Sequence, residues 1–395
     1  MPLLLSYLNV SNSSNLLADS GFIFQDCLLA GMRRLGWKTV LIGPDGSGPL
    51  TTSPVIEVDI PDTKYGVRYN FPWPAIEAAL RGRRLRPDAL LVNQPELALP
   101  LSALVDGHVG RRVPLGVYYH YIPIQDIGTG GQVTFDSSLN DHGLGESIWG
   151  RQVEAAHFAD ILMIGSEWGR ETFIRASGDS ALRHKMFVVP PPTTVHRSST
   201  AAGTRRPVTF LYNHRLYAHY GTAEIFDWLE ELNRRSPGSF RVAVTNPTSH
   251  RSLERRRLDH SIDVLLERIA ELSFVKIVDV ATREAYETLI DQVDIGLSPL
   301  RLNALWNMAI VDLMGKGRPV LGYRYGAIPE IVQDPSMLFE DRNDFITKAG
   351  SLISSPDLIR SKGEQAMVRS AVWEPQKIAR RVDTLFSAVF AAPRA

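Results

Sequence analysis

The residues best suited to binding an anion follow a short apolar run in the second half of the sequence: His214, Arg215 and His219. The run predicts a buried strand, and a helix is expected to open near Gly221. Free amides at a helix N-terminus, the helix dipole and a guanidinium at the end of a strand together favour phosphate. One charge-assisted contact of this kind is worth about 1.5 to 3 kcal/mol. The alternative is an arginine that pairs with a surface carboxylate.

A second helix start lies further along the chain, with an acid behind it. Asn307 and Met308 are predicted to begin a helix whose last turn ends at residues 315–317, before a strand that starts at Pro319. Asp312 falls on the second turn of this helix. If the helix N-terminus holds a phosphate, the carboxylate is within reach of neighbouring hydroxyls. A ribose diol offers two donors to one carboxylate, so a nucleotide suits this arrangement.

Several other motifs are absent or accidental. Gly31, Gly36, Lys38 and Thr39 look like a phosphate loop, but they span the end of a predicted helix and the next strand. The sequence has no His-Glu-x-x-His, no cysteine pair and no Asp-x-Asp. We therefore expect no zinc site, and no metal held by two aspartates in a sugar transfer.

The composition is that of an ordinary globular protein. Of 395 residues, 44% are hydrophobic and 22% charged, and 43 basic residues balance 43 acidic ones. This balance gives no general attraction to nucleic acid or membranes. A lone cysteine, Cys27, the lack of a secretory signal pattern and the lack of a long apolar run predict a cytoplasmic protein without a membrane span. Two basic clusters, interpreted as solvated helix faces, could alternatively contact phosphates: Arg81, Arg83, Arg84 and Arg86, and Arg251 with Arg255, Arg256 and Arg257.

Short β-branched or leucine-rich runs alternate with amphipathic stretches along the whole chain, which predicts repeated β-α units around parallel sheets. Strands are expected in the first half at residues 3–8, 38–42, 89–92, 115–119, 161–164 and 186–189, with helices at 22–35 and 73–84. In the second half we expect strands at 209–212, 240–244, 275–278, 295–297 and 319–321, and helices at 222–234, 261–272, 283–292, 310–316 and 356–370. The fold class is therefore α/β.

The chain is predicted to form two Rossmann-like domains. Residues 1–195 form the first, residues 196–207 form a linker rich in Ser, Thr, Ala and Pro, and residues 208–373 form the second. Open α/β sheets bind ligands at the carboxyl ends of their strands, so a cleft that both domains face is the expected site. A dinucleotide, a nucleotide sugar or a phosphorylated metabolite would each suit such a cleft.

The motifs of the second half resemble those of retaining glycosyltransferases with the GT-B fold, in the large family of sucrose-phosphate and mannosyl transferase type. "FLYNHRL" is similar to the element that contacts donor phosphates, and "VDVATREAYETLIDQVDIGLSPL" to the base pocket. "NALWNMAIVDLMGKGRPVLGYRYGAIPEIV" is similar to the donor loop and helix. "AVWEPQKIARRVDTLFSAV" resembles the last helices, and this likeness implies that residues 374–395 pack back on the first domain.

The resemblance implies roles for particular residues in binding a nucleotide diphosphate-sugar of UDP or GDP type, with no further cofactor. Arg215, together with the helix start at Asn307 and Met308, would stabilise the leaving diphosphate, with His219 as a second cation. Asp312 would hold the ribose. The remaining donor-binding positions that it implies are Val280 and Arg283 beside the base, and Ser20 and Gly21 in the loop after the first strand, close to the phosphates.

In the first domain the resemblance places His120 beside the transferred sugar, as a catalytic residue together with Arg215. A core histidine is the alternative for His120. Asp19, Gln125 and Asp126 are candidate acceptor ligands, and residues 128–145 are a candidate acceptor loop. A shorter likeness, in Asn-His-Arg and "VYYHYIPIQD", is to transferases that glycosylate modified bases of tRNA, of the queuosine type.

The sequence departs from the family pattern in four places. The glutamate that contacts the transferred sugar is replaced by Ala304, the glycine of the donor loop by Asn307, the ribose-binding glutamate by the shorter Asp312, and the lysine after the phosphate-binding arginine by His219 and Tyr220. Three hypotheses follow: a transferase acting on a small-molecule acceptor, a transferase acting on a modified base in DNA or RNA, and a non-catalytic protein that binds a nucleotide sugar.

Overall fold

The computed structural model describes residues 1–8, 16–17, 19–59, 66–129, 131–136, 143–193, 207–245, 261–280, 282–301 and 304–392. The chain divides into two compact units. The first unit comprises Met1–Thr194, Asn303–Trp306 and Trp373–Ala395, and the second comprises Val195–Leu302 and Asn307–Val372. The predicted linker, apart from residue 207, lies outside the described residues.

The first unit is built on a parallel sheet of seven strands in the order β3-β2-β1-β4-β5-β8-β9. This order extends outward in both directions from β1 and β4, as in Rossmann folds, and it places the ligand side at the carboxyl ends of the central strands. The strands are β1 (Leu3–Tyr7), β2 (Lys38–Pro44), β3 (Val55–Val58), β4 (Ala89–Val92), β5 (Leu115–Tyr119), β8 (Ile161–Ile164) and β9 (Met186–Val188).

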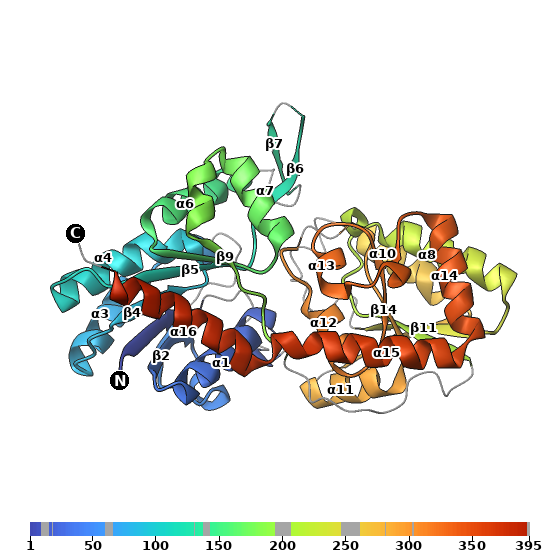
Figure 1. Cartoon of the computed structure of the whole chain (residues 1–395), viewed down its shortest axis with the longest axis horizontal. Helices are drawn as coiled ribbons and strands as arrows, with labels where there is room; N and C mark the ends of the chain where they lie inside the picture. The colour runs from blue at the N-terminus through green and yellow to red at the C-terminus, as the bar shows by residue number, and fades with distance from the viewer. Residues whose placement is uncertain are drawn as a thin grey trace. The chain divides into compact units, whose positions relative to one another are not determined.

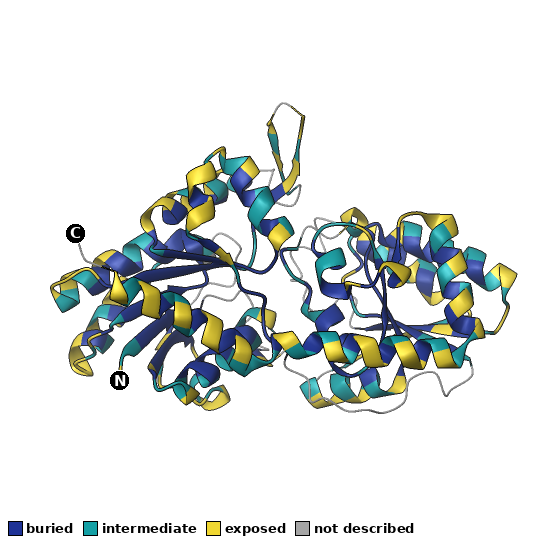
Figure 2. Ribbon diagram, viewed as in Figure 1, coloured by how far each residue is buried: buried dark blue, intermediate teal, exposed yellow. Residues whose placement is uncertain are grey.

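Helices cover both faces of this sheet, so its central strands are buried (Figure 1; Figure 2). Near-continuous apolar runs such as "ALLV" in β4 and "ILMI" in β8 form these strands because a sheet covered on both sides needs apolar side chains on both. The α-helices that belong to the first unit are α1 (Ser20–Arg34), α2 (Gly66–Tyr69), α3 (Trp73–Gly82), α4 (Ala98–Val109), α6 (Leu144–Phe158), α7 (Glu167–Ser177) and α16 (Pro375–Ala391). Short 3-10 turns are η2 (Gly48–Leu50), η3 (Pro95–Leu97) and η4 (Ser180–His184).

A separate antiparallel hairpin, β6 (Ile124–Ile127) and β7 (Val133–Phe135), follows β5. It projects from the rest of the first unit (Figure 1). Its base is fixed by Tyr121, whose hydroxyl donates to Asp136 at 2.9 Å. Part of this segment falls in the predicted acceptor loop, residues 128–145, and the two strands are not predicted from the sequence.

The last helix, α16, packs against α1 of the first unit (Figure 1). Gly31 allows this close approach, because a Cβ there would lie 2.5 Å from the Cβ of Ala379. Trp37 Nε1 donates to Asp383 at 2.7 Å, and the Trp37 ring stacks on Phe390. The C-terminal helix is therefore part of the first unit's core.

The second unit contains a parallel sheet of six strands in the order β12-β11-β10-β13-β14-β15. These strands are β10 (Val208–Tyr212), β11 (Phe240–Thr245), β12 (Val275–Val278), β13 (Ile295–Leu297), β14 (Val320–Tyr323) and β15 (Leu338–Phe339). The helices are α8 (Thr222–Arg235), α10 (Ser261–Ala270), α11 (Arg283–Gln292), α12 (Met308–Gly315), α13 (Ile328–Val332), α14 (Arg342–Ser354) and α15 (Pro356–Ser370), with 3-10 turns η5 (Ala218–Tyr220), η6 (Pro335–Met337) and η7 (Ala371–Trp373), of which the last spans the boundary between the units.

A short segment just before α12 belongs to the first unit, although its neighbours in sequence belong to the second. Leu305 is 1% exposed and lies in the first unit's apolar core. Gly165 and Gly169 make room for it: a Cβ at Gly165 would lie 3.0 Å from the Leu305 carbonyl oxygen and from Trp306 Cβ. Trp306 also contacts Trp373 edge to face, at 5.1 Å between centroids.

Candidate functional site

The loop after β10 is fixed by one partly buried and one buried hydrogen bond. Asn213 Nδ2 donates to the hydroxyl of Tyr286 at 2.7 Å, and His214 Nε2 donates to the carbonyl of Leu297 at 3.0 Å. Burial lowers the pKa of His214 to about 4, so its imidazole is neutral near pH 7. His214 therefore does not supply a positive charge to an anion site. Its hydrogen bond instead holds the loop against β13.

Arg215, the next residue, points its guanidinium away from the core and is exposed. Its neighbours are aromatic: Nη1 lies 3.4 Å from the hydroxyl of Tyr217, and the guanidinium lies 5.8 Å from the centre of that ring. Among the residues that the structure describes, no carboxylate lies within ion-pair distance of Arg215. The alternative interpretation, that Arg215 pairs with a surface carboxylate, is therefore not supported by the described residues.

His219 lies beside Arg215's loop, stacked on Tyr217 with ring centroids 5.1 Å apart and edge-on to Tyr220. The chain then turns at Gly221, whose φ of +70° suits glycine, and α8 begins at Thr222. A Cβ at Gly221 would lie 2.9 Å from Leu300 Cβ, so the turn packs tightly on the segment after β13. No side chain caps the N-terminus of α8.

The helix start predicted at Asn307 and Met308 is confirmed. Asn307 is the N-cap of α12, and its side chain accepts from the amide of Ile310 at 3.1 Å. Met308 is the first helical residue. Asn213 Nδ2 lies 3.4 Å from the carbonyl of Ala309, which brings the loop after β10 against the first turn of α12.

Asp312 is buried within α12, with its side chain 4% exposed, and it is paired with Arg283. Arg283 Nη1 donates to Asp312 Oδ2 at 2.9 Å, while Oδ1 is closed to solvent and has no hydrogen-bond partner among the described residues. Burial raises the pKa of Asp312, and Arg283 opposes this effect. The carboxylate expected to hold a ribose is thus held by an arginine in this structure, with one oxygen left over.

Arg283 is the first residue of α11, which Thr282 caps by accepting from the amide of Ala285. Its guanidinium also lies 3.4 Å from Glu287 and 5.2 Å from the centre of the Tyr286 ring. Val280 precedes this helix and is partly buried. The two base-pocket candidates, Val280 and Arg283, therefore lie close together before and at the start of α11, and Arg283 also reaches Asp312 on α12.

At the carboxyl end of β1, the structure places two candidates differently from the sequence analysis. Ser20 and Gly21, expected in a loop, are the first residues of α1. Asp19 caps this helix, because its Oδ1 accepts from the amides of Gly21 at 2.8 Å and Phe22 at 3.0 Å. The loop prediction was wrong because the helix starts two residues earlier than the apolar period suggested. Asp19 Oδ1 therefore already accepts two hydrogen bonds from the first turn of α1.

His120 directly follows β5, as predicted, at the carboxyl edge of the first sheet. Its ring packs edge-on to Phe24 at 4.7 Å and tilted against Tyr118 at 4.4 Å. Nε2 is closed to solvent and has no hydrogen-bond partner among the described residues. Burial lowers the pKa of His120 to about 3, so the ring is neutral at physiological pH. Gln125 and Asp126 lie further on, in strand β6 of the projecting hairpin, and both are exposed.

Three buried polar residues at the carboxyl end of β4 were not predicted as site candidates: Asn93, Gln94 and Glu96. Gln152 Nε2 donates to Glu96 Oε1 at 3.1 Å, and Arg68 lies 3.6 Å from the same oxygen. Burial raises the pKa of Glu96. The available signal was the run "NQPE" directly after an all-apolar strand, which places polar side chains where such sheets bind ligands.

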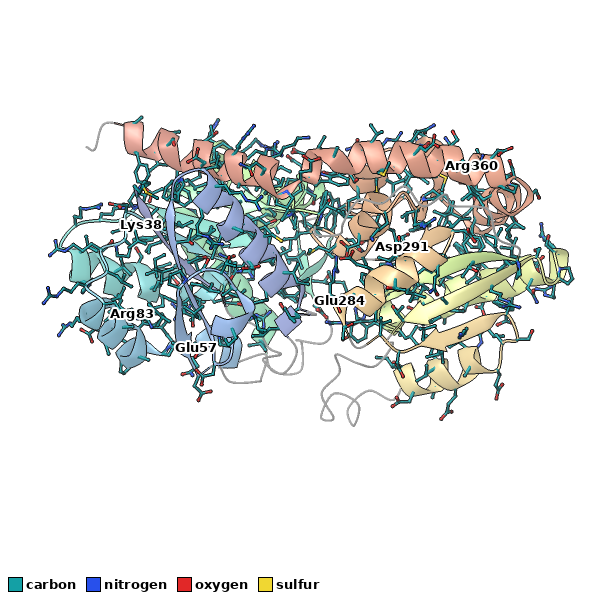
Figure 3. All side chains as sticks on the ribbon, turned by 90° about the horizontal axis from the view of Figure 1, so that it is seen from below. Lys38, Glu57, Arg83, Glu284, Asp291 and Arg360 are labelled. Carbon is teal, nitrogen blue, oxygen red and sulfur yellow. The ribbon has the colours of Figure 1, made fainter. Side chains whose placement is uncertain are left out.

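Two arginines of the basic cluster at the end of α3 have partners within the first unit. Arg81 pairs with Glu77 at 2.7 Å, and Arg83 Nη1 donates to the carbonyl of Val55 at 2.8 Å. Figure 3 shows Arg83 at the surface of the first unit. Its neighbours Arg84 and Arg86 are also exposed. The second cluster, residues 251–257, lies outside the described residues.

No group of three or more His, Cys, Asp or Glu side chains is placed to hold a metal ion, as far as the described residues extend. No described helix is both long and apolar enough to cross a membrane. Ala304, which stands where the family pattern has a glutamate, is partly buried next to the core residue Leu305.

Comparison with known proteins adds evidence on the fold alone. No family model matches the sequence, and no curated protein sequence matches it. Solved structures do match: sucrose-phosphate synthase from Thermosynechococcus elongatus, with TM-score 0.70 and 15% identity, covers 100% of both chains. HepE from Anabaena, solved with UDP and glucose, has TM-score 0.68 and 14% identity over 98% of this chain and 99% of its own.

A third match is the E. coli structure described as trehalose-6-phosphate bound with UDP-2-fluoro glucose. It has TM-score 0.65 and 14% identity, and it covers 99% of this chain and 100% of its own. Each match runs through both units and the final helix. The fold implied by the sequence motifs is confirmed: the chain has the GT-B fold, with two parallel α/β sheets and a last helix that returns to the first unit.

Proposed function

We propose that this protein is a glycosyltransferase that moves a sugar from a nucleotide diphosphate-sugar to an acceptor hydroxyl. The observation that carries the proposal is the grouping at the carboxyl edge of the second sheet. Arg215 lies there without a carboxylate partner among the described residues, Asn213 contacts the first turn of α12, and Asp312 lies one turn later. A cation, a helix N-terminus and an acid suit the phosphates and ribose of one nucleotide.

The donor is proposed to be a UDP-sugar. Two of the solved structures with this fold contain UDP or a UDP-sugar analogue, by their descriptions. We propose that Arg215, with His219 beside it, and the amides at Met308 contact the diphosphate, whose charge grows as the sugar leaves. Stabilising charge at the leaving group lowers the barrier because this interaction is stronger in the transition state than in the bound substrate.

The reaction would break the bond between the anomeric carbon and a diphosphate oxygen and form a bond to the acceptor oxygen. The acceptor's proton would pass to the departing diphosphate, and we propose that the configuration of the sugar is retained. His120 would serve as a neutral hydrogen-bond partner beside the sugar, since a group with a pKa of about 3 carries no proton to give at pH 7. No Asp-x-Asp motif is available to hold a metal in this scheme.

The acceptor is proposed to be a small molecule, bound by the first unit. Two of the arginines at the end of α3 that could contact nucleic-acid phosphates already have partners: Arg81 forms an ion pair, and Arg83 donates to a backbone carbonyl. Asp126 and Gln125 on the hairpin, and Asp19 at the start of α1, stay candidate acceptor ligands. The cytoplasmic location expected from the sequence stays a prediction, which cell fractionation would test.

The proposal is tested by titrating the whole chain with UDP, GDP and their glucose and mannose conjugates, using thermal shift and calorimetry. A nucleotide that binds the native state must raise the melting temperature. Arg215→Ala is expected to lower the rate of donor hydrolysis or transfer at least tenfold, which is the loss of about 1.4 kcal/mol. Arg241→Ala is the matched control, because Arg241 is exposed near the amino end of β11.

Two outcomes would contradict the proposal. If no nucleotide or nucleotide sugar shifts the melting temperature, the second unit is not a donor site. If a nucleotide sugar binds but none is turned over with or without acceptors, the protein is the non-catalytic binder among the three hypotheses. Equal donor kinetics for the Arg215 and Arg241 variants would remove Arg215 from the site.

A further inference from the structure

An arginine surrounded by hydroxyl groups lies near the amino ends of β2 and β3, on the edge of the first sheet opposite to the carboxyl ends where ligands are expected. Arg33 is in the last turn of α1. Its Nη1 donates to the hydroxyls of Thr39, in β2, and Ser53, shortly before β3, and its Nη2 donates to the hydroxyl of Thr52. The parallel pairing of β2 with β3 sets Ser53 level with Thr39. We call Arg33, Thr39, Thr52 and Ser53 the hydroxyl cluster.

Arg33 differs from the comparable arginines of this chain in its lack of an acidic partner. It is only partly exposed, and no carboxylate of the described residues lies within ion-pair distance of it. A guanidinium that loses part of its hydration usually pairs with an acid, because an unpaired charge is costly to bury. Every other buried or partly exposed arginine in the described part of the chain has a carboxylate within 4.0 Å: Arg68, Arg170, Arg268, Arg283, Arg318 and Arg369.

The hydroxyl cluster also has hydrogen-bond donors for which the described residues provide no acceptor. A guanidinium has about five N–H groups, and the contacts of Arg33 use both on Nη1 and one on Nη2, so the Nε hydrogen and one Nη2 hydrogen remain. Each hydroxyl accepts from Arg33 and still has its own hydrogen. Thr39 and Ser53, whose oxygens are 3.1 Å apart, use one of these between them. The second hydrogen of this pair and that of Thr52 are left for a ligand.

The hydroxyl cluster combines a firm base with access from solvent. Thr39 and Ser53 are 3% and 4% exposed, so their positions are fixed by packing. Thr52 is exposed and Arg33 partly so, which lets a small solute reach the remaining donors without any movement of the backbone. The nearest acid along α1, Asp26, accepts from the hydroxyl of Thr51.

We propose that the hydroxyl cluster binds a phosphoryl group, either inorganic phosphate or the phosphate of a small phosphorylated molecule. A phosphoryl group offers at least three acceptor oxygens and close to two negative charges, which suits two N–H and two O–H donors around one cation. The planar guanidinium matches phosphate because its donors form a fixed fork. A carboxylate has only two oxygens and one charge, and an uncharged sugar would leave Arg33 without a counter-charge. All residues of the cluster belong to the first unit, so the inference does not depend on the proposed donor site in the second.

The test measures binding of inorganic phosphate and of glycerol 3-phosphate to the full chain, by phosphorus NMR and by thermal shift at constant ionic strength. Both are measured in the Arg215→Ala background, which excludes phosphate bound through that arginine. At least one probe should bind and raise the melting temperature. Glycerol, the uncharged control, should not. Tighter binding of the ester would identify a phosphorylated metabolite as the ligand, and tighter binding of phosphate would identify the free anion.

Variants assign the binding to the hydroxyl cluster. Arg33→Gln should weaken it at least about tenfold, because charge-assisted hydrogen bonds are lost. Arg34→Gln is the matched control: Arg34 is the next residue of α1 and exposed, and its loss changes the net charge equally, so binding should stay within about twofold. Arg33→Lys keeps the charge but not the fork, and should still weaken binding about threefold or more.

Thr52→Val tests the cluster without touching the cation. It removes one exposed hydroxyl, keeps the shape of the side chain and should weaken binding about threefold to tenfold, as expected for one hydrogen bond. Urea unfolding in chloride alone shows which variants are folded. If Arg33→Gln does not fold, Thr52→Val decides the question.

The inference is overturned if neither phosphate nor glycerol 3-phosphate binds in the Arg215→Ala background. It is also overturned if Arg33→Gln binds as well as Arg34→Gln, because the effect would then belong to net surface charge, or if Thr52→Val leaves binding unchanged. Each of these results can occur whether or not UDP binds to the second unit, so the failure of this inference is distinguishable from failure of the proposed function.

Discussion

Replacing Arg283 by methionine should expose how much of the second unit's stability depends on the Arg283–Asp312 pair. Methionine keeps much of the length and apolar stem of the side chain and removes its charge. Asp312 Oδ2 would lose the donor that lies 2.9 Å away, while Oδ1 already has no described partner. Lys316 would still neutralise Glu287 at 3.3 Å, so Asp312 is the acid most affected.

The expected cost follows from the burial of the two side chains. Breaking a buried ion pair from one side costs about 3 to 5 kcal/mol. Asp312 is 4% exposed but Arg283 is 25% exposed, which places the expected loss near the lower end, at about 3 kcal/mol. Protonation of Asp312 limits the loss: at about 1.4 kcal/mol per pH unit, a carboxyl with an unfolded pKa near 3.9 can cost at most about 4 kcal/mol at pH 7.

The same argument fixes the pH dependence. Burial raises the pKa of Asp312, and without Arg283 nothing as close opposes it. Between pH 3.9 and the raised pKa, the unfolded chain is ionised while the folded chain keeps its proton, so the free energy of unfolding falls as pH rises. Glu287 and Lys316, the other charged groups acting on Asp312, stay in place, and α15 directs Lys362 and Arg369 to Asp334 instead. The deficit should be small near pH 4 and full near pH 7.

The assay follows the second unit through Trp228, which is the only tryptophan of that unit. Urea unfolding of chains labelled with 5-fluorotryptophan resolves this residue by fluorine NMR, with its signal assigned by Trp228→Phe. Asp312→Asn in the Arg283→Met background removes the unpaired charge and should recover at least half of the loss. If the double variant is no more stable than Arg283→Met, or if the deficit does not shrink toward pH 4, the reasoning is refuted.

Three further predictions concern packing and protonation. Gly165→Ala should destabilise the first unit by about 1 to 3 kcal/mol in urea unfolding, since its Cβ would press on the segment around Leu305; Gly150→Ala, exposed in α6 with nothing nearby, should be neutral or stabilising by up to about 1 kcal/mol. Burial lowers the pKa of His214 to about 4, so between pH 6.5 and 4 the unfolded chain binds a proton that the folded chain does not. The free energy of unfolding should therefore fall by about 3 kcal/mol as the pH drops from 6.5 to 4, and by less in His214→Gln. Trp37→Phe should cost about 1 kcal/mol and speed proteolytic release of α16, because one partly buried hydrogen bond is lost.

Much of the sheet architecture could be predicted from the sequence, because buried parallel strands are continuous apolar runs. Strands β4, β5, β8 and β13 have the predicted bounds, and so does β12, a largely exposed edge strand that is not a continuous apolar run. The strand β3, with the pattern "VIEV", the hairpin β6–β7 and the two-residue strand β15 were missed. All are short and depend on neighbours for their pairing, so their local pattern does not distinguish them from loops.

The candidate site could be predicted only in part, because hydrogen-bond partners are set by tertiary structure. The cap at Asn307 and the exposed Arg215 follow from local patterns of helix start and strand end. The pairing of Asp312 with Arg283 does not, because 29 residues separate them and the contact exists only once α11 and α12 pack. The position of Trp306 could not be predicted for the same reason, since no local pattern indicates that its segment belongs to the first unit.

The position of α16 has a consequence for how the protein is made. A ribosome releases the first unit's sheet long before the helix that fills the groove beside Gly31 and Trp37 has been synthesised. Until residue 391 emerges, that face of α1 has no cover and the first unit is incomplete. A nascent first unit would therefore rely on chaperones that shield apolar surface, and a premature stop codon anywhere in the second unit would damage both units at once.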